Sequence, residues 1–167
     1  MNLRPATAAD FPFIHALASR PENAPFISDE PDAALAAYLA DPDSRLLIWE
    51  PEGRPAGFAL YCAIGEPSGA VELRRLALDA PGRGLGARFL RALVDHAFAR
   101  LDAQRLWLDA SSENPRAQKT YERAGFTLEG RLRQHWFRPA LGRNVDLLLY
   151  GMLRAEWEAL EPLPARA

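Results

Sequence analysis

The residues of this sequence with the clearest chemical potential are three closely spaced glycines, Gly82, Gly84 and Gly86. They follow a strand-like stretch at 70–79 and precede a segment, ARFLRALVDHAFARL, whose apolar residues recur at helical spacing. Glycine permits positive φ and lets another molecule approach the backbone closely. The first turn of a helix carries unpaired N–H groups and the positive end of the helix dipole. The sequence therefore predicts an anion site at this turn, with phosphate as its usual ligand.

Other glycine-loop chemistries can be compared with this one. A Walker P-loop ends in Lys followed by Ser or Thr, whereas Ala87 and Arg88 follow the last glycine here, which excludes it. A dinucleotide fingerprint is a closer alternative, because residues 82–87 match G-x-G-x-x-A and Asp109 ends the next strand, where a ribose-binding acid would lie. The charged strand before the turn and the antiparallel pattern of the chain's end disfavour the doubly wound sheet that this fingerprint needs.

The composition is that of an ordinary soluble protein. The chain has 167 residues, of which 49% are hydrophobic and 25% charged, with a net charge of −2. We expect one domain over residues 1–167. The charge gives no indication of a nucleic-acid partner or of a membrane surface. There is no apolar run of membrane-spanning length and no signal-peptide core, so we expect a cytoplasmic protein.

Cysteine and histidine usage points away from metal and disulfide chemistry. The single cysteine, Cys62, excludes an internal disulfide and is typical of a reducing compartment. We expect it to be a buried small residue rather than a nucleophile. His15, His96 and His135 share no metal-ligand spacing, so no metal is expected. His15 and His96 are expected at the surface, and His135 is a weaker candidate to line an acceptor pocket.

The elements that must position the glycine turn alternate between strand and helix patterns. We expect strands over residues 2–6, 45–50, 55–64, 70–79, 105–110, 126–138 and 144–153. We expect helices over about 11–20, 29–39, 84–101 and 115–124, with one further turn in the tail. This order predicts an α/β (α+β) fold, with about four helices flanking a mixed, mostly antiparallel sheet of about six to seven strands.

Local signals support several of these boundaries. Thr7 is a plausible N-cap with Asp10 three residues later, and Asn114 caps a helix that ends before Gly125. The helix at 29–39 is expected to turn one apolar face inward, made of Leu35, Tyr38 and Leu39.

Two motifs make nearly the whole chain resemble the GNAT superfamily of acyl-CoA-dependent N-acetyltransferases. The first is LRRLALDAPGRGLGARFL and the second is LWLDASSENPRAQKTYERAGF. In the second, five residues fall in register with the family pattern N-x-x-A-x-x-x-Y-x-x-x-G-F: Asn114, Ala117, Tyr121, Gly125 and Phe126. The end of the chain is similar to the branch that includes ribosomal-protein N-terminal acetyltransferases.

The resemblance implies a site for acetyl-CoA. In the family, main-chain amides of the glycine turn hold the pyrophosphate, here those of Arg83, Gly84, Leu85, Gly86 and Ala87. The preceding strand splays from its neighbour and pairs with the pantetheine arm, which assigns that role to Leu76, Ala77 and Leu78. Asn114 would contact the pantetheine arm or the substrate in addition to capping its helix. The family loop usually begins with Gln or Arg where this sequence has Pro81, so Arg83 is the candidate for the missing charge.

Acetyl transfer to an amine requires loss of an amine proton, stabilisation of the thioester oxygen and protonation of the leaving thiolate. The resemblance implies Glu72 as general base, because it lies four residues before Leu76. It implies Tyr121 as general acid, since a phenol of pKa about 10 can protonate a thiolate of pKa about 8.5 in contact with it. The sequence offers no plausible acyl-carrying nucleophile, so direct attack in a ternary complex is expected.

The resemblance leaves the acceptor open among primary amines: a peptide N-terminus, an amino acid, a polyamine or an amine-bearing antibiotic. We expect its pocket near residues 21–31 and 136–143. Four arginines form either a solvated face or a basic patch that would suit acidic acceptors: Arg74, Arg75, Arg131 and Arg133. A non-catalytic acyl-CoA-binding module remains an alternative, and the terminal strand pair could support a homodimer.

Overall fold

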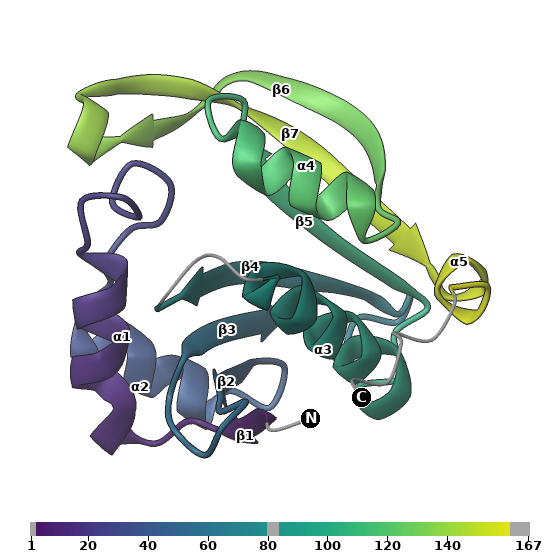
Figure 1. Cartoon of the computed structure of the whole chain (residues 1–167), viewed down its shortest axis with the longest axis horizontal. Helices are drawn as coiled ribbons and strands as arrows, with labels where there is room; N and C mark the ends of the chain where they lie inside the picture. Colours follow the sequence, from purple (N-terminus) through teal and green to yellow (C-terminus); the bar gives the residue numbers. More distant parts are fainter. Residues whose placement is uncertain (1–2, 80–83, 161–167) are drawn as a thin grey trace.

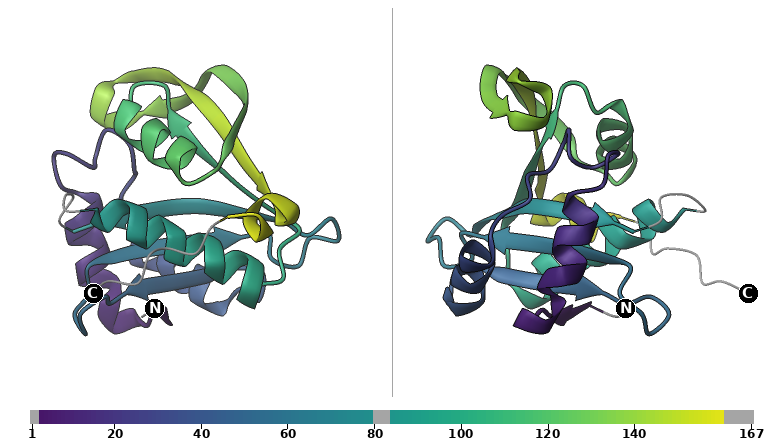
Figure 2. Two further views of the ribbon diagram at one scale, coloured as in Figure 1. Left: turned by 45° about the vertical axis from the view of Figure 1, so that its right-hand side comes forward. Right: turned by 90° about the vertical axis from the view of Figure 1, so that its left-hand side faces the viewer.

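The computed structural model describes residues 3–79 and 84–160, and its strands form one sheet with helices on both faces (Figures 1 and 2). The strands are β1 (Leu3–Pro5), β2 (Arg45–Trp49), β3 (Gly57–Cys62), β4 (Ala70–Leu78), β5 (Arg105–Ser111), β6 (Thr127–Arg138) and β7 (Arg143–Leu153). Their order across the sheet is β1-β2-β3-β4-β5-β7-β6. The β4–β5 pair is parallel and the other neighbouring pairs are antiparallel. The predicted mixed, mostly antiparallel sheet is confirmed.

The helices divide between the two faces of the sheet. They are α1 (Phe11–Ala18), α2 (Asp32–Ala40), α3 (Leu85–Arg100), α4 (Pro115–Arg123) and α5 (Arg154–Glu158), with short 3-10 turns at Ala8–Asp10 and Pro139–Leu141. One core packs α3 and α4 on the sheet and includes Phe89, Leu93 and Leu106. The other packs α1 and α2 on the opposite face and includes Ile14, Leu35 and Phe58. Strands β2 and β3 are thus covered on both faces, which agrees with the burial of nearly all their residues.

The sheet splits in the middle, between its only parallel neighbours in the described part of the chain. Strands β4 and β5 pair at three positions, the last joining Glu72 to Trp107. Beyond it β4 continues to Leu78 and β5 to Ser111 with no further pairing between them. Figure 1 shows the result: the β5-β7-β6 half diverges from the β1-to-β4 half, and α3 and α4 lie on either side of the opening. The divergence leaves facing backbone edges without strand partners.

The outer edge of the β5-β7-β6 half is irregular. Strand β6 pairs with β7 through two shifts of register, between Leu128 and Gly130 and between Leu132 and Trp136. Gln134, within the second shift, has a φ of 48°. These are β-bulges, which bend a strand and strengthen its twist.

Some helix and strand boundaries differ from the predicted ones at a proline or at a residue with positive φ. Helix α2 begins at Asp32 rather than near residue 29, because Pro31 disfavours helical geometry at the residue before it. The predicted inward position of Leu39 is wrong, since that side chain is 39% exposed. Strand β3 ends at Cys62, before Ala63 with a φ of 58°.

Several local signals are confirmed. The Asn114 Oδ1 accepts a hydrogen bond from the Ala117 amide at 3.1 Å, which caps α4. Gly125 takes a φ of 96° directly after that helix. The Asp10 carboxylate accepts from the Thr7 amide at 2.8 Å at the start of the first helical turn.

The cysteine and two of the histidines, His15 and His96, make contacts within the fold. Cys62 is buried, and its sulfur lies 3.7 Å from the Ser44 hydroxyl. His15 lies 2.7 Å from carboxylates of both Asp29 and Asp32, which raise its pKa. The expectation that His96 is a surface residue is wrong: it is half-buried and stacks on Tyr61, and burial lowers its pKa.

Two classes of feature are absent from the described ranges, 3–79 and 84–160. No helix there is long and apolar enough to cross a membrane. No group of three or more His, Cys, Asp or Glu side chains there is arranged to hold a metal ion.

Candidate active site

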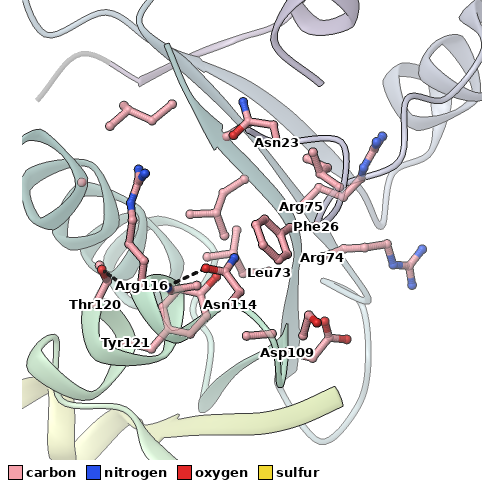
Figure 3. A pocket seen from close by; sticks show the side chains of 18 of the residues that line it. Asn23, Phe26, Leu73, Arg74, Arg75, Asp109, Asn114, Arg116, Thr120 and Tyr121 are labelled. Atoms are coloured by element: carbon pink, nitrogen blue, oxygen red, sulfur yellow. Dashed lines mark hydrogen bonds between the residues drawn. The ribbon is translucent and has the colours of Figure 1, made fainter. Parts of the chain in front are cut away.

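A pocket of about 610 Å³ occupies the opening between β4 and β5. Its walls come from both faces of the sheet: α3 and α4 on one face, and the segment between α1 and α2 on the other, with the end of β6. Figure 3 shows Asn114, Arg116, Thr120 and Tyr121 together on one side and Arg74 and Arg75 on the other. The pocket therefore spans the opening of the sheet and is bordered by elements from both of its faces.

The amino end of α3 borders the pocket on the first side. Gly84 precedes the helix with a φ of 74°, a conformation that favours glycine, and the Arg88 amide makes the first helical hydrogen bond back to it. The amides of Leu85, Gly86 and Ala87 lie in the first turn, where no intrahelical acceptor exists. Gly86 lines the pocket, and a Cβ there would meet no protein atom. Arg83 and Pro81 lie outside the described residues.

The free edge of β4 forms one wall. Leu76, Ala77 and Leu78 all line the pocket. Hydrogen bonding alternates along an antiparallel ladder, and the Asp79 amide donates to the Ala56 carbonyl of the β3 side. Ala77, two residues earlier, therefore directs its amide and carbonyl to β3. The main-chain groups of Leu76 and Leu78 point into the gap instead.

Asn114 and Tyr121 line the pocket from α4 and the turn before it. Tyr121 is 6% exposed and packs against Tyr150 and Phe126, at ring-centroid distances of 5.7 and 6.1 Å. Burial, and then the charge of nearby Asp109, raise the pKa of its phenol well above the ordinary value. Tyr121 is thus protonated throughout the neutral pH range.

Two carboxylates lie near the point where β4 and β5 separate. Glu72 is in the last β4–β5 pair and accepts hydrogen bonds from the Arg74 guanidinium at 2.6 and 3.0 Å. Asp109 lines the pocket, whereas Glu72 is not among the lining residues. Burial, followed by the charge of Glu72, raises the pKa of the Asp109 carboxyl. A carboxylate with a raised pKa is a stronger base than an ordinary one.

The second side of the pocket is aromatic and basic. Phe26, Arg75, Trp136 and Arg138 line it. Arg138 is 2% exposed, stacks over the Trp136 ring with its guanidinium carbon 3.3 Å from the centroid, and donates to the Phe26 carbonyl. Burial lowers its pKa to about 10, so it stays charged at neutral pH.

Of the four arginines expected to form one patch, the structure brings only Arg74 and Arg75 to the pocket. Arg131 and Arg133 are exposed on β6, where Arg131 pairs with Asp146. His135 is also exposed and is not among the lining residues.

The ranges expected to border the pocket, 21–31 and 136–143, agree with its lining, which includes Phe26 and Arg138. The sequence presents Asp109 only as a ribose ligand, although its position after an apolar alternation in β5 could mark it as a pocket carboxylate. No local signal singles out Arg138 within its range, because its partners lie in the segment between α1 and α2, more than 100 positions away.

The chain belongs to the GNAT family of acetyltransferases. The family model for the acetyltransferase (GNAT) family matches residues 11–126, which include α3, both walls of the sheet opening and Tyr121. The predicted family is confirmed, and the dinucleotide alternative is set aside. The protein is an N-acetyltransferase that uses acetyl-CoA, and the free β4 edge and open α3 terminus fit that co-substrate.

Relatives in sequence include N-acetyltransferases with different names. Over 153 residues the chain is 25% identical to spermidine N(1)-acetyltransferase of Escherichia coli K12, covering 87% of this chain and 82% of that protein. Over 83 residues it is 31% identical to a candidate ribosomal N-acetyltransferase of Bacillus subtilis, covering 50% of this chain and 44% of that protein.

The fold is shared with spermidine N-acetyltransferase of Vibrio cholerae. A crystal structure of that protein in complex with CoA and spermine has a TM-score of 0.80 at 22% identity, covering 94% of this chain and 97% of that one. A dodecameric structure of the same protein has a TM-score of 0.77 at 23% identity, covering 95% and 96%.

The two glycines at the start of α3 should respond differently to alanine. Gly84→Ala should lower the free energy of unfolding by about 1 kcal/mol, because a Cβ strains left-handed backbone. Gly86→Ala should leave stability unchanged or slightly higher, yet weaken CoA binding about tenfold by filling space beside the free amides. Urea unfolding and calorimetric titration with CoA measure the two effects. Equal destabilisation by both changes, or full CoA affinity in Gly86→Ala, would contradict this assignment.

Proposed function

We propose that residues 1–167 act as one acetyltransferase domain in which the acceptor amine attacks acetyl-CoA directly within a ternary complex. The observation that carries this proposal is the pocket in the opening of the sheet, which is lined by residues from both faces. It allows acetyl-CoA to enter beside α3 and α4 while the acceptor enters beside α1 and α2. The two reactants then meet between β4 and β5.

The proposed cofactor contacts follow the free backbone groups. The first-turn amides of α3, from Leu85 to Ala87, bind the pyrophosphate together with the turn at Gly84, with Arg83 as an added charge. The pantetheine arm pairs with the main chain of Leu76 and Leu78, and Ala77 contributes its surface to the wall. Asn114 contacts the arm from the start of α4.

In the proposed reaction the amine nitrogen forms a bond to the thioester carbon, and the carbon–sulfur bond breaks. Tyr121 donates its phenol hydrogen to the departing sulfur. Because its pKa is raised, complete transfer depends on a matching rise in the thiol pKa within the same apolar surroundings. A hydrogen bond to the developing thiolate is favourable in either case.

We propose that the carboxylate pair of Glu72 and Asp109 removes the amine proton. Asp109 borders the pocket and receives the proton. Glu72, which the sequence predicts to be the base, instead raises the pKa of Asp109 through its negative charge. The amine must arrive near the point where β4 and β5 separate for this transfer to occur.

The proposed acceptor is the primary amine of a small molecule or of a peptide N-terminus, since the named relatives act on spermidine or are linked to ribosomal acceptors. The dodecamer formed by the related Vibrio cholerae enzyme supports a homo-oligomer as the working assembly. A reducing cytoplasm is the compartment that the single free cysteine favours.

The proposal is tested by thiol release. The purified protein is mixed with acetyl-CoA and a panel of diamines, amino acids, aminoglycosides and short peptides, and free CoA is followed over time. We expect turnover with at least one acceptor class. Tight CoA binding without turnover on any amine would instead favour a non-catalytic acyl-CoA sensor.

Tyr121→Phe removes the donated hydrogen and keeps the ring that packs on Tyr150 and Phe126. We expect kcat to fall on the order of 100-fold, the usual contribution of a general acid, while the Kd for acetyl-CoA changes little. Steady-state kinetics and calorimetry measure the two quantities. A parallel loss of kcat and of CoA affinity would show that Tyr121 serves packing instead.

Asp109→Asn should lower kcat on the order of 100-fold. Glu72→Gln should keep most of the activity but move the acid limb of the kcat–pH profile to lower pH. The reason is that Glu72 raises the pKa of Asp109, so its removal lets Asp109 remain deprotonated in more acidic solution. If Glu72→Gln gives the larger loss and Asp109→Asn is nearly normal, Glu72 is the base.

A further inference from the structure

The second side of the pocket holds two buried arginines with unused hydrogen-bonding capacity. Arg138 is 2% exposed and Arg75 is 8% exposed. The Arg138 Nε and the Arg75 Nη2 are buried and have no hydrogen-bond partner among the described residues. Buried polar groups are rarely left in this state, because each one costs free energy unless an acceptor is supplied.

Of the two arginines, Arg138 has fewer negatively charged groups near its guanidinium. Its guanidinium donates to two neutral oxygens, the Phe26 carbonyl and, at 3.5 Å, the Ser28 hydroxyl. Its face stacks on Trp136. Within the described residues it makes no ion pair with a carboxylate, and Asp109 acts on it only from a distance. A cation in this position favours an anion that enters the pocket.

Arg75 is only partly compensated. Its Nη1 donates to the Glu30 carboxylate at 2.7 Å, which leaves the Nη2 group without an acceptor. Arg75 lines the same pocket as Arg138, and its positive charge lowers the pKa of Arg138. Each guanidinium presents a planar set of N–H donors that matches the geometry of a carboxylate.

The acidic residues of the pocket are mostly engaged. Glu30 pairs with Arg75, and Glu113 makes two hydrogen bonds of 2.7 Å with Arg143. Asp109 is the proposed base, and Glu22 is exposed at the rim. A polyamine carries several ammonium groups and needs free carboxylates to bind them. The pocket instead holds an uncompensated positive charge, that of Arg138, which attracts an anion.

We propose that the acceptor is an amino carboxylate: a primary amine whose carboxylate, a few bonds away, is bound by Arg138 and Arg75. This inference rests on the proposed function and names the substrate class of the same site. The amine faces Asp109, and the carboxylate faces the arginine pair. The source of this chemistry is either a free amino acid-like molecule or a peptide with an acidic side chain near its N-terminus.

The direct test compares acceptors that differ only at the far end. The free series is γ-aminobutyrate, 4-aminobutanamide and 1,4-diaminobutane, and the peptide pair is Ala-Asp-Ala-amide and Ala-Asn-Ala-amide. We expect kcat/KM to be at least about tenfold higher for the carboxylate member of one series, the effect of a hydrogen-bonded ion pair. The series that shows the preference identifies the source.

The variants tie the preference to the pocket. Arg138→Met should abolish the carboxylate preference and leave the Kd for acetyl-CoA unchanged, and Arg75→Met should reduce it. Arg133→Met is the matched control, because it removes the same charge from the same strand at an exposed position outside the pocket. If Arg138→Met does not fold, the comparison of acceptors on the unaltered protein and the Arg75→Met variant still decide the matter.

A second readout does not require these amines to be substrates. With any acceptor found in the broad screen, butyrate should inhibit competitively against the acceptor, and butanamide should not. Equal inhibition by both compounds, or a preference for the diamine over the amino acid, would overturn the carboxylate site. If the unaltered protein transferred acetyl groups to no amine, the proposed function would be wrong. Failure of the carboxylate site is therefore distinguishable from failure of the proposed function.

Discussion

The structure depends on the early end of pairing between β4 and β5. Parallel pairing stops at Glu72 and Trp107, and each strand continues alone. A sheet interrupted in its centre leaves backbone groups without partners, which is costly in a dry interior. Here the opening is a pocket of about 610 Å³ bordered by helix ends and polar side chains, so the unpaired backbone groups stay accessible to water or to a bound molecule. In the proposed reaction, the same interruption is where acetyl-CoA and the acceptor amine meet.

The positions of the residues proposed to bind acetyl-CoA could be predicted from the sequence because their signals are local. Gly84 and Asn114 each fix the start of a helix through their own conformation or side chain, and the spacing from Asn114 to Tyr121 follows from helical geometry. Apolar alternation was strong enough to give the strands and the mixed sheet. Errors occurred at element ends, where Pro31 and Ala63 outweighed the periodic pattern.

The second side of the pocket could be predicted only as two ranges, 21–31 and 136–143, because tertiary contacts decide which of their side chains enter it. Arg138 reaches the pocket from β6 and meets a segment that lies before α2, so no spacing rule relates the two. The sequence leaves Arg75 open between a solvated strand charge and a basic patch, because its contacts with Phe58 and Glu30 are tertiary. These arginines differ from ordinary surface arginines because they are buried. A hydrophobicity pattern does not predict the burial of a charged side chain.

The bulges of β6 have a consequence for association. As the outermost strand of its half, β6 would normally present a continuous row of free N–H and C=O groups, which invites another chain to add as a strand. Two register shifts and the left-handed Gln134 interrupt that row. Ladder extension and fibrillar stacking along this edge are therefore disfavoured. Contacts made by this hairpin must rely on side chains such as Leu128 and Phe137, which are 51% and 55% exposed.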